Sequence, residues 1–119
     1  MSDLTNITHP AELEKSQAYI TVEIVEYVPN SVVIKTILKK STGNISVISV
    51  DSGEELSEKT SPFDTFVQVI DGKVDLFIGD KQHLLLTGAS IIIPAHASNH
   101  VKPDGRFKMI LTVIKSGYE

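Results

Sequence analysis

Residues 53–72 read GEELSEKTSPFDTFVQVIDG. Residues 53–64 are mostly polar, which is typical of a loop, and TFVQVI then alternates apolar and polar side chains with a period of two. This alternation predicts a half-buried β-strand. Asp71-Gly72 predicts a tight turn after the strand, because glycine readily adopts the positive φ that such turns require. The stretch therefore predicts a polar loop leading into a strand, with Lys59, Ser61 and Thr65 where the two meet.

Similar signals continue on both sides of this stretch. Residues 20–24 alternate in the same way, and Gly79-Asp80 lies between two apolar runs, where glycine suits the first position of a two-residue hairpin. Pro103-Asp104-Gly105 predicts another turn. Strands that recur about every ten residues, with no helix between them, indicate an antiparallel all-β sandwich or barrel. The other predicted strands are SVVIKTILKK (31–40), NISVISV (44–50), KVDLFI (73–78), HLLLT (83–87), SIIIP (90–94) and RFKMILTVIK (106–115).

The N-terminal residues show a different pattern. Pro10 follows His9 at a position that a first helical turn tolerates, and acidic residues come close behind it. The sequence therefore allows a short helix over residues 9–15. With 119 residues the chain is long enough for one domain with its own core. We divide it into an N-terminal extension, residues 1–18, and a β-barrel domain, residues 19–119.

Composition narrows the classes of partner. The formal net charge is −4 and no basic run is longer than Lys39-Lys40, so we expect no nucleic-acid partner and no membrane partner. The sequence has no cysteine, which excludes disulfides, thiolate catalysis and cysteine-ligated metals. The N-terminus lacks the basic start and apolar core of a secretory signal, and no segment approaches the length of a membrane span. We therefore expect a cytoplasmic protein.

Two predicted strands are apolar on both faces. Residues 84–86 read LLL and residues 91–93 read III. One face of each strand lines the interior, so the other face needs a second cover. A second copy of the chain, in contact through sheet faces or exchanged edge strands, would supply it, as would a second layer of sheet. We expect a homodimer.

The positions of the glycines and prolines between residues 53 and 103 resemble those of the cupin family of small jelly-roll barrels. The first cupin motif has a glycine, five residues, His-x-His, a three- or four-residue gap, a glutamate, six residues and a glycine. That spacing is kept here by Gly53, Lys59, Ser61, Thr65 and Gly72. In the second motif Gly88 and Pro94 fit, and residue 99 stands in the place of a histidine.

The resemblance covers roughly residues 24–115, because the stretches before and after the two motifs are also similar to small cupins of uncharacterised function. The interval between the motifs, residues 73–87, is about the shortest that cupins use. The resemblance implies a single-domain cupin jelly-roll barrel, that is, a double-stranded β-helix.

The metal-ligand positions depart from the family's pattern. In metal-binding cupins two histidines, a glutamate and a third histidine hold one divalent ion, and the corresponding residues here are Lys59, Ser61, Thr65 and Asn99. His96 stands where a glycine is usual, and Pro103 where the final asparagine is. A lysine amine must lose its proton to coordinate, which costs about 4–5 kcal/mol at pH 7, and neutral hydroxyls and amides are weak ligands. We predict no metal site and no cofactor.

His96 and His100 raise a separate question. They lie four residues apart, a spacing that chelates a metal on a helix. The stretch follows Pro94 and lacks a helical pattern, and on an extended strand residues four apart are roughly 13 Å from each other. We expect these histidines at the rim, facing solvent. A slip of one residue would instead bring His100 into the barrel in place of Asn99.

If the four changed positions still point inward, they present an ammonium, two hydroxyls and an amide at the barrel mouth. This set suits a small anionic or polyhydroxylated molecule. The alternative is that Lys59 extends into solvent or pairs with Glu55, Glu58 or Asp64. Met109, on the last strand, either faces the cavity or fills a gap in the core. The candidate ligand-binding residues are Lys59, Ser61, Thr65, Asn99, His100 and Met109, and no catalytic residue is assigned.

The sequence thus predicts a metal-free module that binds a small polar or anionic molecule, such as a sugar or a carboxylate. One alternative is a metal-independent enzyme, for example an isomerase or epimerase. For that reaction Asp64 is a candidate general base, but no acidic or basic partner is identified. The other alternative is a structural dimerisation module with a filled cavity.

Overall fold

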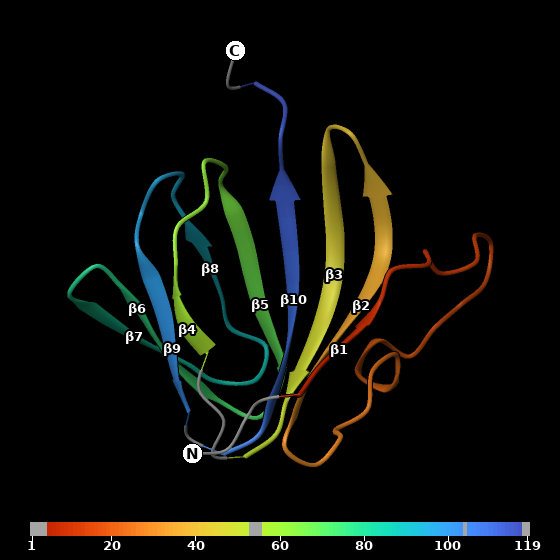
Figure 1. Ribbon diagram of the computed structural model, residues 1–119, viewed down its shortest axis with the longest axis horizontal. Coiled ribbons are helices and arrows are strands. Elements are labelled where there is room, and N and C mark those ends of the chain that lie inside the picture. Colours follow the sequence, from red (N-terminus) through yellow and green to blue (C-terminus); the bar gives the residue numbers. More distant parts are fainter. Residues whose placement is uncertain (1–4, 53–55, 104, 118–119) are drawn as a thin grey trace.

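The computed structural model describes residues 5–52, 56–103 and 105–117, which form two β-sheets that face each other (Figure 1). The larger sheet has the strand order β1-β2-β3-β10-β5-β8, and the smaller has the order β4-β9-β6-β7. The predicted all-β, largely antiparallel architecture is confirmed. The strands are β1 (Thr5–His9), β2 (Ser31–Lys40), β3 (Gly43–Val50), β4 (Leu56–Lys59), β5 (Thr65–Asp71), β6 (Val74–Ile78), β7 (Lys81–Leu85), β8 (Ser90–Ile93), β9 (Asn99–Pro103) and β10 (Phe107–Ile114).

Three of these strands, β1, β4 and β9, were not predicted from the sequence. β4 and β9 are short and largely polar and pair with each other, and β1 pairs in parallel with β2 along the edge of the larger sheet. No helix forms over residues 9–15, because β1 extends to His9 and residues 10–20 contain no helix or strand. Such a short segment cannot hold a helix without tertiary support. Here the contacts of β1 with β2 determine the local structure.

Residues 20–24 form no strand, although their side chains alternate. They contain a 3-10 helix, η1 (Thr21–Glu23), and the chain then crosses the outer face of the larger sheet. Val25 is only 2% exposed and packs on Val33 of β2 and Val47 of β3. We call residues 19–28 the strap. Their apolar side chains cover the sheet instead of extending it, which explains why the strand prediction was wrong.

Three hydrogen bonds fix the strap to the sheet. The Lys108 ammonium donates to the backbone oxygen of Val22 at 2.7 Å, and the Ser49 hydroxyl donates to that of Glu26 at 2.8 Å. The Tyr27 hydroxyl donates to the Asp71 carboxylate at 2.6 Å. Burial, followed by the hydrogen bond and charge of Asp71, raises the pKa of Tyr27 well above its ordinary value of about 10. Tyr27 therefore remains a donor throughout the physiological range.

The strap covers only part of the outer face of the larger sheet. Phe66 on β5 and Ile92 on β8 are cross-strand partners on the part beyond it, and they are 39% and 61% exposed. Leu84 and Leu86, at the edge of the smaller sheet, are also exposed. In the single chain, the predicted apolar runs at residues 84–86 and 91–93 therefore each still expose apolar side chains to solvent.

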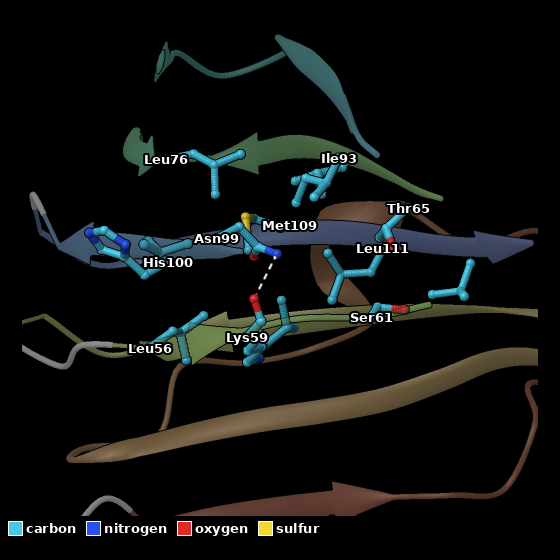
Figure 2. Close-up of a pocket in the computed structure, with 14 residues that line it drawn as sticks. Leu56, Lys59, Ser61, Thr65, Leu76, Ile93, Asn99, His100, Met109 and Leu111 are labelled. Carbon is cyan, nitrogen blue, oxygen red and sulfur yellow. Dashed lines mark hydrogen bonds between the residues drawn. The ribbon is translucent and has the colours of Figure 1, made fainter. Parts of the chain in front are cut away.

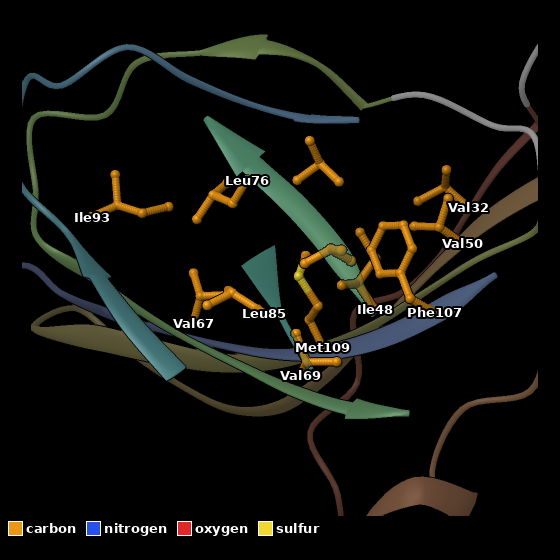
Figure 3. Close-up of a cluster of buried hydrophobic side chains, with 12 residues drawn as sticks. Val32, Ile48, Val50, Val67, Val69, Leu76, Leu85, Ile93, Phe107 and Met109 are labelled. Atoms are coloured by element: carbon orange, nitrogen blue, oxygen red, sulfur yellow. The ribbon is translucent and has the colours of Figure 1, made fainter. Parts of the chain in front are cut away.

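The interior between the sheets is filled at one end only. Phe107, Val69 and Val74 are completely buried where β10 and β6 begin and β5 ends (Figure 3). Val32, Val50 and Leu85 complete this packed end. The opposite end, where β5 begins and β10 ends, is less filled and contains the cavity described below.

The two turns predicted at Gly72 and Gly79 are confirmed. Gly72 has a φ of +80° between β5 and β6, and Gly79 has a φ of +59° in the β6–β7 hairpin, in which Ile78 pairs with Lys81. Gly105, in the third predicted turn, has a φ of +87°. Gly53 of the first motif and Asp104 of the third turn lie outside the described residues.

Candidate functional site

A cavity of about 190 Å³ lies between the two sheets, at the end of the barrel where β4, β8 and β10 end and β5 and β9 begin (Figure 2). Both sheets contribute apolar side chains to its walls. They are Ile48, Leu56, Val67, Leu76, Ile93, Val101, Met109, Leu111 and Val113. The polar lining residues belong to β4, β5, β9 and the loop between β4 and β5, and they are Lys59, Ser61, Thr65, Asn99 and His100.

Ser61 and Thr65 both line the cavity and lie toward the right of the view in Figure 2, with Leu111 between them. Thr65 shares the inward face of β5 with Val67 and Val69, as the alternation predicts. The Ser61 hydroxyl oxygen accepts a hydrogen bond from the backbone N–H of Phe63 at 3.2 Å. Its own proton remains available to donate, because a hydroxyl both donates and accepts.

Lys59 ends β4 and lines the cavity while remaining exposed to solvent. Among the residues that the structure describes, none forms an ion pair with its ammonium. Glu58, one of the predicted partners, accepts a hydrogen bond from the Ser98 hydroxyl instead. Glu55, another, lies outside the described residues. Lys59 therefore lines the cavity with an exposed ammonium that has no counter-charge among the described residues.

Asn99 lies on β9 opposite Lys59, and its amide holds the two strands together. The side-chain nitrogen donates to the backbone oxygens of Lys59 and Ala97, each at 3.3 Å. Figure 2 shows the bond to Lys59 crossing between the two strands. Both amide protons are thus committed to the backbone. Asn99 can offer a ligand only its carbonyl oxygen, which is an acceptor.

The side chain of His100 does not enter the cavity. His100 pairs across the sheet with Phe77, and the two rings stack with their centroids 4.7 Å apart. Because Leu76 and Ile78 on either side of Phe77 pack in the core, Phe77 and His100 belong to the outer face of the smaller sheet. The alternative register, with His100 inside in place of Asn99, is therefore wrong. His100 borders the cavity at one end of the view in Figure 2.

His96 lies in the loop between β8 and β9, with a φ of +68°. This is the left-handed region that glycine enters most easily, which gives a physical reason why glycine is usual in this slot. The backbone N–H of His96 donates to the oxygen of Ser61 at 2.6 Å, and the Asp64 carboxylate accepts from the N–H of Ala95 at 2.8 Å. These bonds join the two loops at the mouth. Asp64 is exposed and serves this link.

Met109 is 4% exposed and lines the cavity floor together with its neighbours on β10. Sequence reasoning did not identify the apolar wall formed by Leu56, Ile93, Leu111 and Val113. The sequence of β10 indicated part of this wall, because Met109, Leu111 and Val113 follow one another at intervals of two residues and share one face of the strand. The sequence of β10 alone did not indicate which of its two faces points into the barrel.

No family model and no curated protein matches the sequence. Solved structures do match the fold. A conserved protein of unknown function from Streptococcus pyogenes superposes with a TM-score of 0.83 at 22% identity, covering 92% of this chain and 96% of that one. A cupin superfamily protein from Desulfitobacterium hafniense gives a TM-score of 0.81 at 23% identity, covering 87% and 95%. The chain has the cupin fold.

A third similar structure belongs to a longer cupin. The cupin 2 conserved barrel domain protein from Leptotrichia buccalis is 29% identical, with a TM-score of 0.75, over 79% of this chain and 46% of that one. These similarities confirm the resemblance that the two sequence motifs predicted. They establish the cupin barrel and leave the ligand to be argued from the residues.

The residues at the cupin metal-ligand positions do not fit a divalent cation. Lys59 carries an ammonium, and Ser61 and Thr65 offer neutral hydroxyls. The amide nitrogen of Asn99, at the fourth position, is bound to backbone oxygens. Within the described part of the chain, no three His, Asp or Glu side chains lie close enough to hold a metal ion. No step of the function proposed below therefore passes through a metal.

Within residues 5–52, 56–103 and 105–117, no helix is long and apolar enough to cross a membrane.

Proposed function

We propose that this cupin is a metal-independent binding module for a small polar or anionic molecule. The observation that carries the proposal is the open-ended cavity, in which the described donor side chains free to meet a ligand, Lys59, Ser61 and Thr65, lie close together in the sequence. Ligand sites are typically apolar hollows with a few polar groups that orient the ligand. Lys59 supplies the charge, and Ser61 and Thr65 supply the neutral donors.

The enzymatic alternative has less support. An isomerase or epimerase needs an acid and a base that reach the substrate. Among the described residues that line the cavity there is no carboxylate, and the ring of His100 is stacked on Phe77 outside it. Asp64 is exposed and holds the β8–β9 loop. The observed groups can bind and orient a ligand but supply no acid–base pair.

Replacing Lys59 by alanine tests this proposal. A thermal-shift screen of sugars, carboxylates and phosphates should identify at least one compound that raises the melting temperature of the natural protein, before and after treatment with a chelator. In Lys59→Ala this shift should disappear, because the ligand loses its counter-charge. The free energy of unfolding without ligand should change by less than about 1 kcal/mol, since the side chain is exposed. Binding that requires an added divalent metal would refute the proposal.

We also propose that two copies associate through the uncovered part of the larger sheet. Phe66 and Ile92 form an exposed apolar pair there, and Ile114 at the end of β10 is exposed as well. The strap already covers another part of the same face, so a partner must supply an apolar surface for the remainder. A second copy meets this requirement, because a two-fold axis sets the same patch against itself.

An aspartate at Ile92 should disrupt this association. The substitution places a charge in the centre of the proposed contact, where it would be desolvated without a partner. Light scattering coupled to size-exclusion chromatography should give two chains for the natural protein and one for Ile92→Asp. Leu84→Asp, at a similarly exposed leucine on the other sheet, is the matched control and should remain dimeric. A natural protein that is monomeric at high concentration would contradict the proposal.

A further inference from the structure

The cavity is small. An apolar protein cavity of about 150 Å³ accommodates benzene, and this one measures about 190 Å³. The ligand that it can enclose is therefore about one ring, or one branched aliphatic group, with a small substituent. A larger molecule would have to leave most of its atoms outside the barrel.

The walls favour an apolar group inside. Beyond the mouth they consist of buried side chains, among them Val67, Ile93 and Met109. Each sugar hydroxyl placed against such a wall would lose its hydrogen bonds to water without replacement, at a cost of about 1–3 kcal/mol. A sugar is thus a poor match for the interior, although the polar mouth alone would accept it.

The donors at the mouth favour a carboxylate. Lys59, Ser61 and Thr65 all lie within the short stretch that connects β4 to β5. The neighbouring carboxylate of Glu58 is bonded to Ser98, and the amide protons of Asn99 are bonded to Lys59 and Ala97. The described part of the mouth therefore offers one cation and two hydroxyl donors to an acceptor with negative charge. Charge-assisted hydrogen bonds of this kind are among the strongest.

We infer that the ligand class is a small amphipathic carboxylate, with its single apolar group buried in the barrel and its carboxylate at the mouth. This inference rests on the proposed binding function and narrows it to one class. The apolar group packs against Met109 and Leu111. The carboxylate accepts hydrogen bonds from Ser61 and Thr65 and pairs with Lys59, whose flexible side chain can follow it.

Benzoate is a suitable probe, with benzamide as its uncharged analogue and glucose and inorganic phosphate as polar comparisons. Methyl-labelled protein is titrated with each compound and followed by NMR. Benzoate should shift the methyl signals of Met109, Leu111 and Val67. It should leave Val25 and Val47 unchanged, because they lie in the separate cluster between the strap and the outer face of the larger sheet. Glucose and phosphate should shift none of these signals.

Lys59→Met tests the carboxylate. It keeps most of the aliphatic stem and removes the charge, so benzoate should bind at least about tenfold more weakly, while benzamide should bind as it does to the natural protein. Lys81→Met removes one positive charge from the exposed β6–β7 hairpin and is the matched control. It should bind benzoate normally. Equal weakening of benzoate and benzamide by Lys59→Met would overturn the ion pair.

The remaining outcomes distinguish failure of this inference from failure of the proposed binding function. If glucose or phosphate moves the Met109 and Leu111 signals and benzoate does not, the ligand class is wrong but the cavity is still a binding site. If benzoate moves none of the cavity methyl signals, the inference is wrong, and the wider thermal-shift screen then decides whether the cavity binds anything else.

Discussion

Gly72→Ala should destabilise the protein by about 3 kcal/mol or more. Gly72 has a φ of +80°, where a side chain is strained by roughly 1–2 kcal/mol. A methyl group at this position would also lie 2.4 Å from the backbone oxygen of Arg106 and 3.2 Å from Phe107. Backbone atoms of β10 and the fully buried Phe107 cannot move aside without opening the packed end of the barrel.

Gly79→Ala provides the matched comparison. Gly79 also has a positive φ, of +59°, but a methyl group there would have no neighbour within 4 Å. It should therefore cost only the conformational strain, about 1 kcal/mol. Urea denaturation of both variants measures the difference directly. Equal costs would show that the close approach of Gly72 to β10 contributes nothing to stability.

Val25→Asp should have the second large effect, a loss of about 3 kcal/mol. Val25 is 2% exposed and packs on Val33 and Val47 in the apolar cluster between the strap and the larger sheet. A carboxylate at this position would be moved from water into an apolar cluster, so either the barrel is destabilised or the strap leaves the sheet. In the second case the strap loses the three hydrogen bonds that fix it to the sheet. These are the bonds from Lys108 and Ser49 to the strap backbone and the bond from Tyr27 to Asp71.

Two measurements distinguish these results. Urea denaturation reports the free energy of unfolding, and a glutamate-specific protease reports release of the strap by cutting after Glu23 or Glu26. Thr21→Asp introduces the same charge at an exposed position of the same segment, and it should change neither readout. If Val25→Asp is as stable and as resistant as the natural protein, the strap is not a structural part of the barrel.

The strands that alternate over a long stretch were predictable from the sequence, because alternation marks a strand that turns one of its two faces to the core. β2, β3, β5 and β10 are examples. Gly72 and Gly79 marked the turns between β5 and β6 and between β6 and β7. β4 and β9 were not predictable, since both are mostly polar and gain their structure only by pairing at the mouth. β1 pairs in parallel with β2, and no turn motif in the sequence indicates such a pairing, because parallel strands are not joined by a short hairpin turn.

The site was predictable in part for the same reason. The motif spacing brought Lys59, Ser61, Thr65 and Asn99 to one cavity, as expected for a barrel in which loop and strand ends converge. The state of each side chain was not predictable. The register of β9 against β4 and β6 decides both states. It lets the Asn99 amide donate to backbone oxygens, and it stacks the ring of His100 on Phe77 outside the cavity. The largely apolar wall required the inward faces of both sheets together.

The parallel pairing of β1 with β2 also bears on the order in which the molecule folds. A parallel pair cannot be closed by a short turn, so the whole segment between His9 and Ser31 must be looped before its first ladder bond forms. The antiparallel β2–β3 pair needs only the turn at Ser41-Thr42. We therefore expect β2 and β3 to pair early in folding and β1 to pair with β2 last. The rate of folding should then depend little on the N-terminal strand.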